Sequence, residues 1–75
     1  MASSTYDQFR VVLKRLHFEK VRSEKHETWR KVLPNGTILR VRISHKHGKD
    51  MPNWLFHEML RQSGIDKDEF KKILR

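Results

Sequence analysis

The chain has 75 residues, no cysteine, and 17 lysines and arginines against 9 acidic residues, which gives a formal net charge of +8. We expect a single domain over residues 1–75 with a small core, and a disordered N-terminus over residues 1–4. The lack of cysteine excludes a disulfide framework and a thiolate metal site. No apolar run has the length of a membrane span or a signal-peptide core, so we expect a soluble, cytoplasmic protein.

The positive charge is concentrated in the first two-thirds of the chain. Twelve lysines and arginines and three acids lie between Arg10 and Lys49, whereas residues 50–75 hold five of each sign. A basic region next to a neutral one favours a surface that binds a polyanion over evenly spread solubilising charge. A solvated basic surface without a ligand remains the alternative. A membrane surface is disfavoured, because no segment combines a basic face with a broad apolar one.

The chain begins with the pattern of an amphipathic helix. Thr5 followed by Gln8 has the form of a capping box, which predicts the start of this helix. The segment from Phe18 to about Arg22 is predicted to form a short strand after it. The apolar stripe of the helix, with spacings of three and four residues, consists of Tyr6, Phe9, Val12, Leu13 and Leu16.

Two β-rich segments flank a Pro34-Asn35-Gly36 turn and together predict a β-hairpin. In its second strand polar and apolar residues alternate, so Arg40 and Arg42 should share one face. The first strand mixes both kinds of residue and does not show which face is buried, although Trp29 is the better anchor. The alternating residues of the second strand are Leu39, Val41 and Ile43 on one face, and Ile38, Arg40 and Arg42 on the other.

The last third of the chain predicts two helices. Pro52 suits the first turn of the first of them, and Gly64 suits its C-terminal cap. Asp66 followed by Glu69 is typical of the start of a short final helix. The predicted order is α-β-β-β-α with a short extra C-terminal helix. This is an α+β fold in which helices cover one face of a three-stranded antiparallel sheet.

Several motifs of the sequence are typical of one family. They are Phe18, Lys25-His26-Glu27-x-Trp29, Pro34-Asn35-Gly36, and a last segment with His47-x-x-Asp50-Met51-Pro52 and Met59-Leu60-Arg61-Gln62-Ser63-Gly64-Ile65. On these residues the chain resembles the HicA (YcfA-like) family of mRNA-interferase toxins over nearly its full length. The resemblance implies a fold like a double-stranded-RNA-binding domain and cleavage of mRNA without a metal or other cofactor. It also implies a HicB-type antitoxin as partner and His26 as the catalytic residue.

Histidine chemistry suits this activity. The 2′-hydroxyl of RNA can attack the adjacent phosphate once a base removes its proton, and imidazole titrates near neutrality, at about pH 6.5. His26 begins the hairpin, and His45 and His47 follow its end, so the three should share one edge. Nearby cations would offset the charge of the phosphorane. The residues expected to bind RNA are Arg22, Lys25, Trp29 (as a platform for base stacking), Arg30, Arg40, Arg42, His45, Lys46, His47 and Lys49.

Three alternatives stay open. If His26 only contacts phosphate, the domain is a non-catalytic RNA-binding module of the same fold. The basic face can instead receive an acidic protein partner. Zinc binding by His26, His45 and His47 is disfavoured, because no cysteine or acidic fourth ligand accompanies them and the positive surroundings repel cations.

Overall fold

The computed structural model describes residues 4–24, 26–44 and 49–75, and its elements follow the predicted order. Its first strand begins one residue after Phe18, and its second helix begins directly after Pro52. The elements are α1 (Tyr6–Arg15), β1 (Glu19–Ser23), β2 (His26–Val32), β3 (Ile38–Ser44), α2 (Asn53–Ser63) and α3 (Lys67–Leu74).

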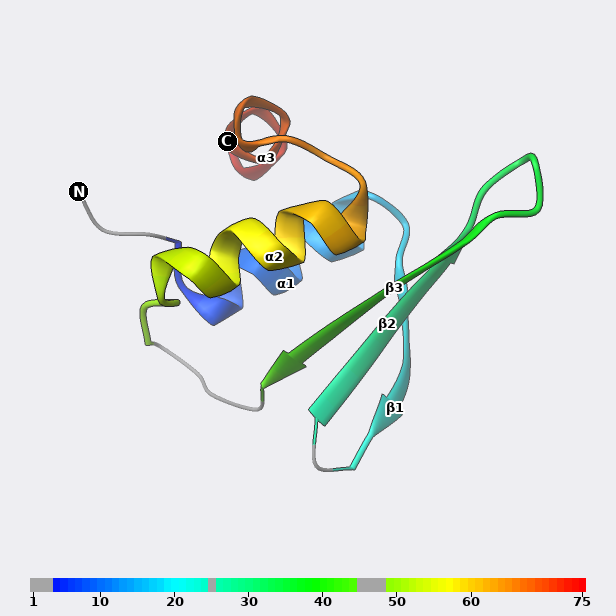
Figure 1. Ribbon diagram of the computed structural model, residues 1–75, viewed down its shortest axis with the longest axis horizontal. Helices are drawn as coiled ribbons and strands as arrows, with labels where there is room; N and C mark the ends of the chain where they lie inside the picture. Colours follow the sequence, from blue (N-terminus) through cyan, green and yellow to red (C-terminus); the bar gives the residue numbers. More distant parts are fainter. Residues whose placement is uncertain (1–3, 25, 45–48) are drawn as a thin grey trace.

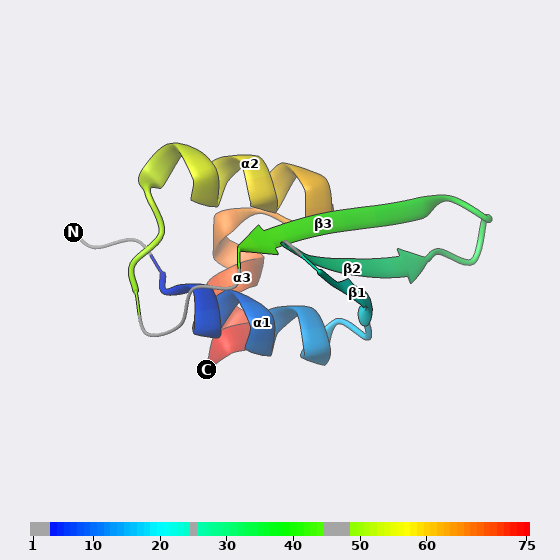
Figure 2. The same cartoon turned by 90° about the horizontal axis from the view of Figure 1, so that it is seen from below.

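The three strands form one antiparallel sheet in the order β1-β2-β3, and the helices lie on one side of it (Figure 1). α1 and α2 overlap in the view of Figure 1 but lie apart in the turned view of Figure 2, and α3 packs against both of them. The end of the β2–β3 hairpin that carries the turn projects beyond the helices. The predicted α+β architecture is therefore confirmed.

The hairpin turn has the geometry that its sequence predicts. The Gly36 amide donates to the Leu33 carbonyl at 2.9 Å, and the Leu33 amide donates to the Thr37 carbonyl at 2.8 Å. Gly36 has φ +90°, a value that a residue with a Cβ adopts only with strain. This turn fixes the register of β2 against β3, which pairs Val32 with Ile38 at the turn end.

The core lies between the helices and the inner face of the sheet. Phe9, Phe56 and Phe70 bring one aromatic ring each from α1, α2 and α3, with neighbouring ring centroids 5.0 to 6.1 Å apart. Rings at these separations attract one another beyond the burial of their area. Val41 and Ile43 of β3 add fully buried side chains from the sheet. α3 is thus part of the core.

The starts of α1 and α3 follow the capping rules, whereas the end of α1 departs from them. Thr5 and Gln8 form the predicted capping box, with hydrogen bonds of 2.9 and 3.1 Å in the two directions. The Asp66 side chain accepts from the Glu69 amide at 2.8 Å and caps α3. The left-handed residue after α1 is His17, with φ +70°, where helices usually carry glycine.

The segment before α1 is held by the segment before α2. The Met51 amide donates to the Ser4 carbonyl at 3.0 Å, and the Tyr6 amide donates to the Lys49 carbonyl at 3.1 Å. The expectation that Ser4 belongs to a disordered terminus is therefore wrong, because its carbonyl is bonded to the body of the domain; residues 1–3 lie outside the described residues. None of the helices described has the length and apolar character needed to cross a membrane.

Candidate nucleic-acid interface

β2 divides its side chains between two very different environments. Glu27 and Trp29 point toward the helices and are only 4% and 3% exposed. His26 and Arg30 alternate with them and are exposed, which places them on the outer face of the sheet, opposite the helices. The two-residue repeat of a strand is the cause, because successive side chains leave opposite faces. The sequence left the buried face of this strand undecided.

The outer face carries a row of arginines from three strands. Arg30 lies opposite Arg40, and Arg42 and Arg22 both pair with Thr28 of the central strand. These side chains surround a groove of about 830 Å³, open to solvent. The residues that line it are Val21, Arg22, Glu24, His26, Thr28, Arg30, Arg40, Arg42 and Gln62. We call this surface the arginine face.

Apart from Arg75, the last residue of the sequence, the arginines of the chain fall into two groups. Arg10 binds the buried carboxylate of Glu27, Arg15 donates to the carbonyls that end α3, and Arg61 pairs with Glu58 on α2. In contrast, no carboxylate of the described residues forms an ion pair with the guanidinium of an arginine on the arginine face. The exposed members of this second group are Arg22, Arg30, Arg40 and Arg42. Their charges are available to an anionic ligand.

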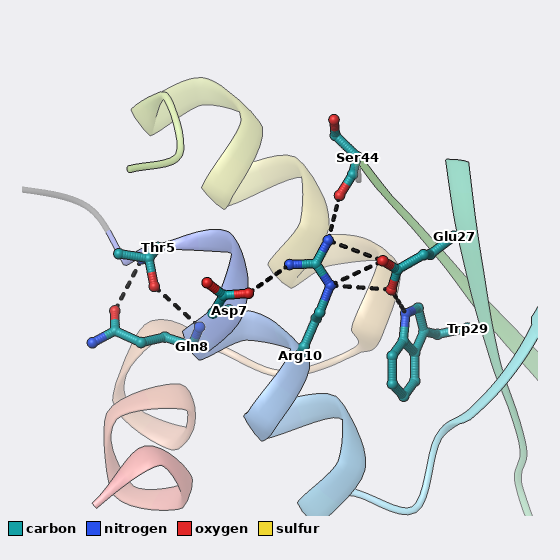
Figure 3. Close-up of polar contacts among 7 residues, drawn as sticks. All are labelled: Thr5, Asp7, Gln8, Arg10, Glu27, Trp29 and Ser44. Carbon is teal, nitrogen blue, oxygen red and sulfur yellow. Dashed lines mark hydrogen bonds and ion pairs between the residues drawn. The ribbon is translucent and has the colours of Figure 1, made fainter. Parts of the chain in front are cut away.

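A buried polar network joins α1 to the ends of β2 and β3 (Figure 3), on the face of β2 opposite to that of His26. Arg10 binds Glu27 through Nε and Nη2, and Glu27 Oε1 also accepts from Trp29 Nε1 at 3.1 Å. Burial raises the pKa of the Glu27 carboxyl, but the hydrogen bonds from Arg10 and Trp29 and the charges of Arg10 and Lys20 outweigh it. The pKa of Glu27 is therefore lower than that of an ordinary glutamate, and the carboxylate stays charged.

The structure gathers some of the predicted RNA-binding residues and separates others. His26 shares the groove with the four arginines. The prediction that Trp29 stacks on a base is wrong, because its ring is buried in the core on the helix side and its N–H donates to Glu27. Lys49 is exposed beside the start of α1 and does not line the groove. Lys25, His45, Lys46 and His47 lie outside the described residues.

Four residues that line the groove beside the arginines were not predicted from the sequence, namely Val21, Glu24, Thr28 and Gln62. Thr28 lies between Arg22 and Arg42 in the sheet and places a hydroxyl in the groove. Gln62, at the end of α2, accepts a hydrogen bond from the Arg42 amide at 3.5 Å and closes one side of the groove. The alternation of β2 would have placed Thr28 on this face once Trp29 was assigned to the core. No local pattern predicts Gln62, because its contact joins residues twenty positions apart.

The arrangement combines a cationic surface with an exposed imidazole. Guanidinium groups bind phosphate through paired N–H donors, and an imidazole in the same groove can accept a proton from a bound hydroxyl. Within residues 4–24, 26–44 and 49–75, no three histidine, aspartate or glutamate side chains are grouped as metal ligands. Comparisons with protein-family models, with curated proteins and with solved structures find no match to this chain.

Proposed function

We propose that this chain is a metal-independent endoribonuclease of the HicA toxin type that acts on mRNA, with His26 as its general base. The observation that carries the proposal is the position of His26 in one groove with four exposed arginines that have no carboxylate partner among the described residues. Arginines of this kind hold a phosphate backbone and offset the charge that develops on a phosphorane. The resemblance of the sequence to the HicA family supports the same assignment.

The proposed reaction uses the ribose of the substrate as nucleophile. His26 takes the proton of the 2′-hydroxyl, the 2′-oxygen forms a bond to phosphorus, and the bond to the 5′-oxygen breaks. The leaving oxygen takes up a proton from solvent or from a second acid, for which the sequence offers His45 and His47. The products are a 2′,3′-cyclic phosphate and a 5′-hydroxyl. A deoxyribose strand lacks the nucleophile and is not cut.

A non-catalytic RNA-binding module is the second candidate. The arginine face itself favours it, because four guanidinium groups on an open sheet bind phosphates whether or not a proton is transferred. Among the described residues that line the groove, His26 alone carries an aromatic ring, so these residues offer bases no large ring to stack on. Binding through this surface therefore depends on the phosphate backbone more than on the base sequence.

The two candidates separate in one assay on labelled single-stranded RNA with EDTA present. We expect the wild type to cut the strand and to leave cyclic-phosphate ends, and a DNA strand of the same sequence to stay intact. We expect His26→Ala to lower the cleavage rate by about 10²- to 10⁴-fold, the range typical of a general base, with RNA affinity changed by less than about twofold. Binding by both proteins without cutting would favour the module. Equal cutting by both would remove His26 from the mechanism.

The salt dependence of binding tests the arginine face directly. Removing one arginine that binds a phosphate of single-stranded RNA should reduce the slope of log affinity against log salt by about 0.7. We expect this reduction in Arg40→Ala and in Arg42→Ala. The matched control is Arg61→Ala, whose guanidinium is occupied by Glu58 on α2 and lies outside the groove. An unchanged slope in all three variants would contradict RNA binding at this surface.

The resemblance also leads us to propose a HicB-type antitoxin as a protein partner. Charge supports a partner of this kind, because the arginine face suits acidic side chains as well as phosphates. Size-exclusion chromatography with the product of the adjacent reading frame tests this proposal. Tight binding to that protein without any RNA affinity at low salt would instead support a protein-interaction domain.

A further inference from the structure

One guanidinium on the helix side of the sheet binds the residue that follows His26 in β2 and the residue that pairs with His26 in β3. Arg10 Nε lies 3.1 Å from each carboxylate oxygen of Glu27, the residue that follows His26 in β2. Arg10 Nη2 donates to the Ser44 carbonyl at 2.6 Å, and Ser44 is the residue paired with His26 across the sheet. Figure 3 shows this guanidinium between α1 and the ends of both strands.

The position of this guanidinium is itself fixed from α1. Arg10 Nη1 donates to Asp7 Oδ1 at 3.0 Å, one helical turn earlier. The start of α1 is in turn defined by the capping box of Thr5 and Gln8. The ends of β2 and β3 are therefore bonded to a helix as well as to each other. This end of the hairpin is the one without the turn. Paired strands separate most easily at such an open end.

We propose that Arg10 is a positioning residue for His26, an inference that rests on the nuclease function proposed above. Arg10 fixes the open end of the hairpin from the helix side. The imidazole on the outer face then keeps one position relative to Arg22 and Arg42 in the groove. Arg10 does not contact the RNA, because it is 8% exposed and lies on the opposite face of the sheet. Its effect on the reaction is transmitted through the backbone of Glu27 and Ser44.

The chemistry of the network agrees with a geometric role. A buried ion pair loses much of its attraction to the cost of removing two charges from water, and apolar replacements are often as stable. Packing alone would therefore be satisfied by two apolar side chains at positions 10 and 27. What apolar side chains do not supply is direction. The planar guanidinium of Arg10 donates to the Glu27 carboxylate and to the Ser44 carbonyl at fixed angles. These hydrogen bonds define the positions of the ends of β2 and β3 relative to α1.

The test removes both charges together, so that no unpaired carboxylate stays buried. In Arg10→Met with Glu27→Gln, the amide oxygen at position 27 can still accept from Trp29 Nε1. The matched control is Arg15→Met, an arginine of the same helix whose bonds go to carbonyls at the end of α3. Three quantities are measured for both proteins and the wild type. They are RNA affinity, single-turnover cleavage across pH, and amide hydrogen exchange by NMR.

We expect the double variant to bind RNA within about twofold of the wild type, since the arginine face is intact. Its single-turnover cleavage should fall by at least about tenfold, with a shifted pH profile, because a displaced base loses both alignment and environment. Amides of residues 26–28 and 42–44 should exchange at least about tenfold faster, while those of residues 30–32 and 38–40 keep the wild-type rate.

These measurements test the positioning role of Arg10 and the nuclease activity independently of each other. If the wild type does not cut RNA, the proposed function fails, and local exchange at residues 26–28 still shows whether Arg10 holds the strand ends. If the wild type and the double variant cut equally, the positioning role is wrong while the nuclease stands. Faster exchange over the whole sheet would make Arg10 an ordinary stabilising residue and would also overturn the inference.

Discussion

Arg30 and Arg40 lie directly opposite each other on the outer face of β2 and β3. Like charges in this position oppose sheet formation, whereas opposite charges support it. No ion pair with a described carboxylate relieves either guanidinium. The sheet therefore carries a local electrostatic cost at the centre of its exposed face, which an anionic ligand would remove.

Reversing one of these charges should stabilise the free protein. We expect Arg40→Glu to raise the free energy of unfolding by about 0.2 to 1 kcal/mol, because it converts a repulsive cross-strand pair into an attractive one. RNA affinity should fall at the same time. Urea unfolding at low salt measures the first effect. Arg61→Glu changes the net charge equally on α2, where it would face Glu58; an equal gain in that variant would show that net charge, and not the pair, is responsible.

The buried carboxylate of Glu27 should make the fold sensitive to acid. Its pKa is lower in the folded chain than in the unfolded chain, so the unfolded chain takes up the proton first as the pH falls. The stabilisation is complete above the unfolded pKa of about 4.3 and is lost as the pH drops through the lower folded value. Urea unfolding at a series of pH values should show this loss. Glu27→Gln should make the free energy of unfolding depend less steeply on pH in this range. Glu19→Gln, an exposed glutamate of β1, should keep it.

The left-handed residue after α1 offers a stabilising substitution. His17 has φ +70°, a conformation that costs residues with a Cβ about 1 kcal/mol or more, and glycine adopts it without strain. We expect His17→Gly to raise the free energy of unfolding by about 0.5 to 1 kcal/mol, after the entropy of the more flexible unfolded chain is counted. Chemical denaturation measures the gain.

The control for this substitution is another exposed histidine. His57 lies within α2 and has no positive φ, so His57→Gly should lower the stability by about 1 kcal/mol. A loss of stability in both variants would mean that the imidazole of His17 makes a contribution larger than the strain of its backbone.

Local sequence patterns were sufficient for the elements and their order. The Thr5 capping box, the Pro34-Asn35-Gly36 turn and the alternation from Ile38 to Ile43 each depend on residues close together in the chain, and each prediction is confirmed. The face of β2 was not predictable in the same way, because both of its faces mix polar and apolar residues: Glu27 and Trp29 share one face, and Arg30 and Val32 share the other. Its assignment depends on the helices that cover Trp29.

The networks that involve α1 had no local signal. Arg10 and Glu27 are seventeen positions apart, and Arg15 and the carbonyl of Ile73 are 58 apart. Arg10 and Arg15 count toward the basic first two-thirds of the sequence, yet both are bound within the domain. Net charge alone therefore overstated the cations available to a ligand, and the ion pairs of the folded chain identify those that remain.

Because side chains alternate along β2 and β3, the number of residues in each strand determines which side chains face the core and which face solvent. Deleting one residue between His26 and Trp29 would turn every later side chain of β2 to the opposite side. A guanidinium would then meet the phenylalanine rings, and an indole would face water. A substitution on one face of the sheet changes that face alone. A deletion changes both faces, and so disrupts the core and the arginine face together.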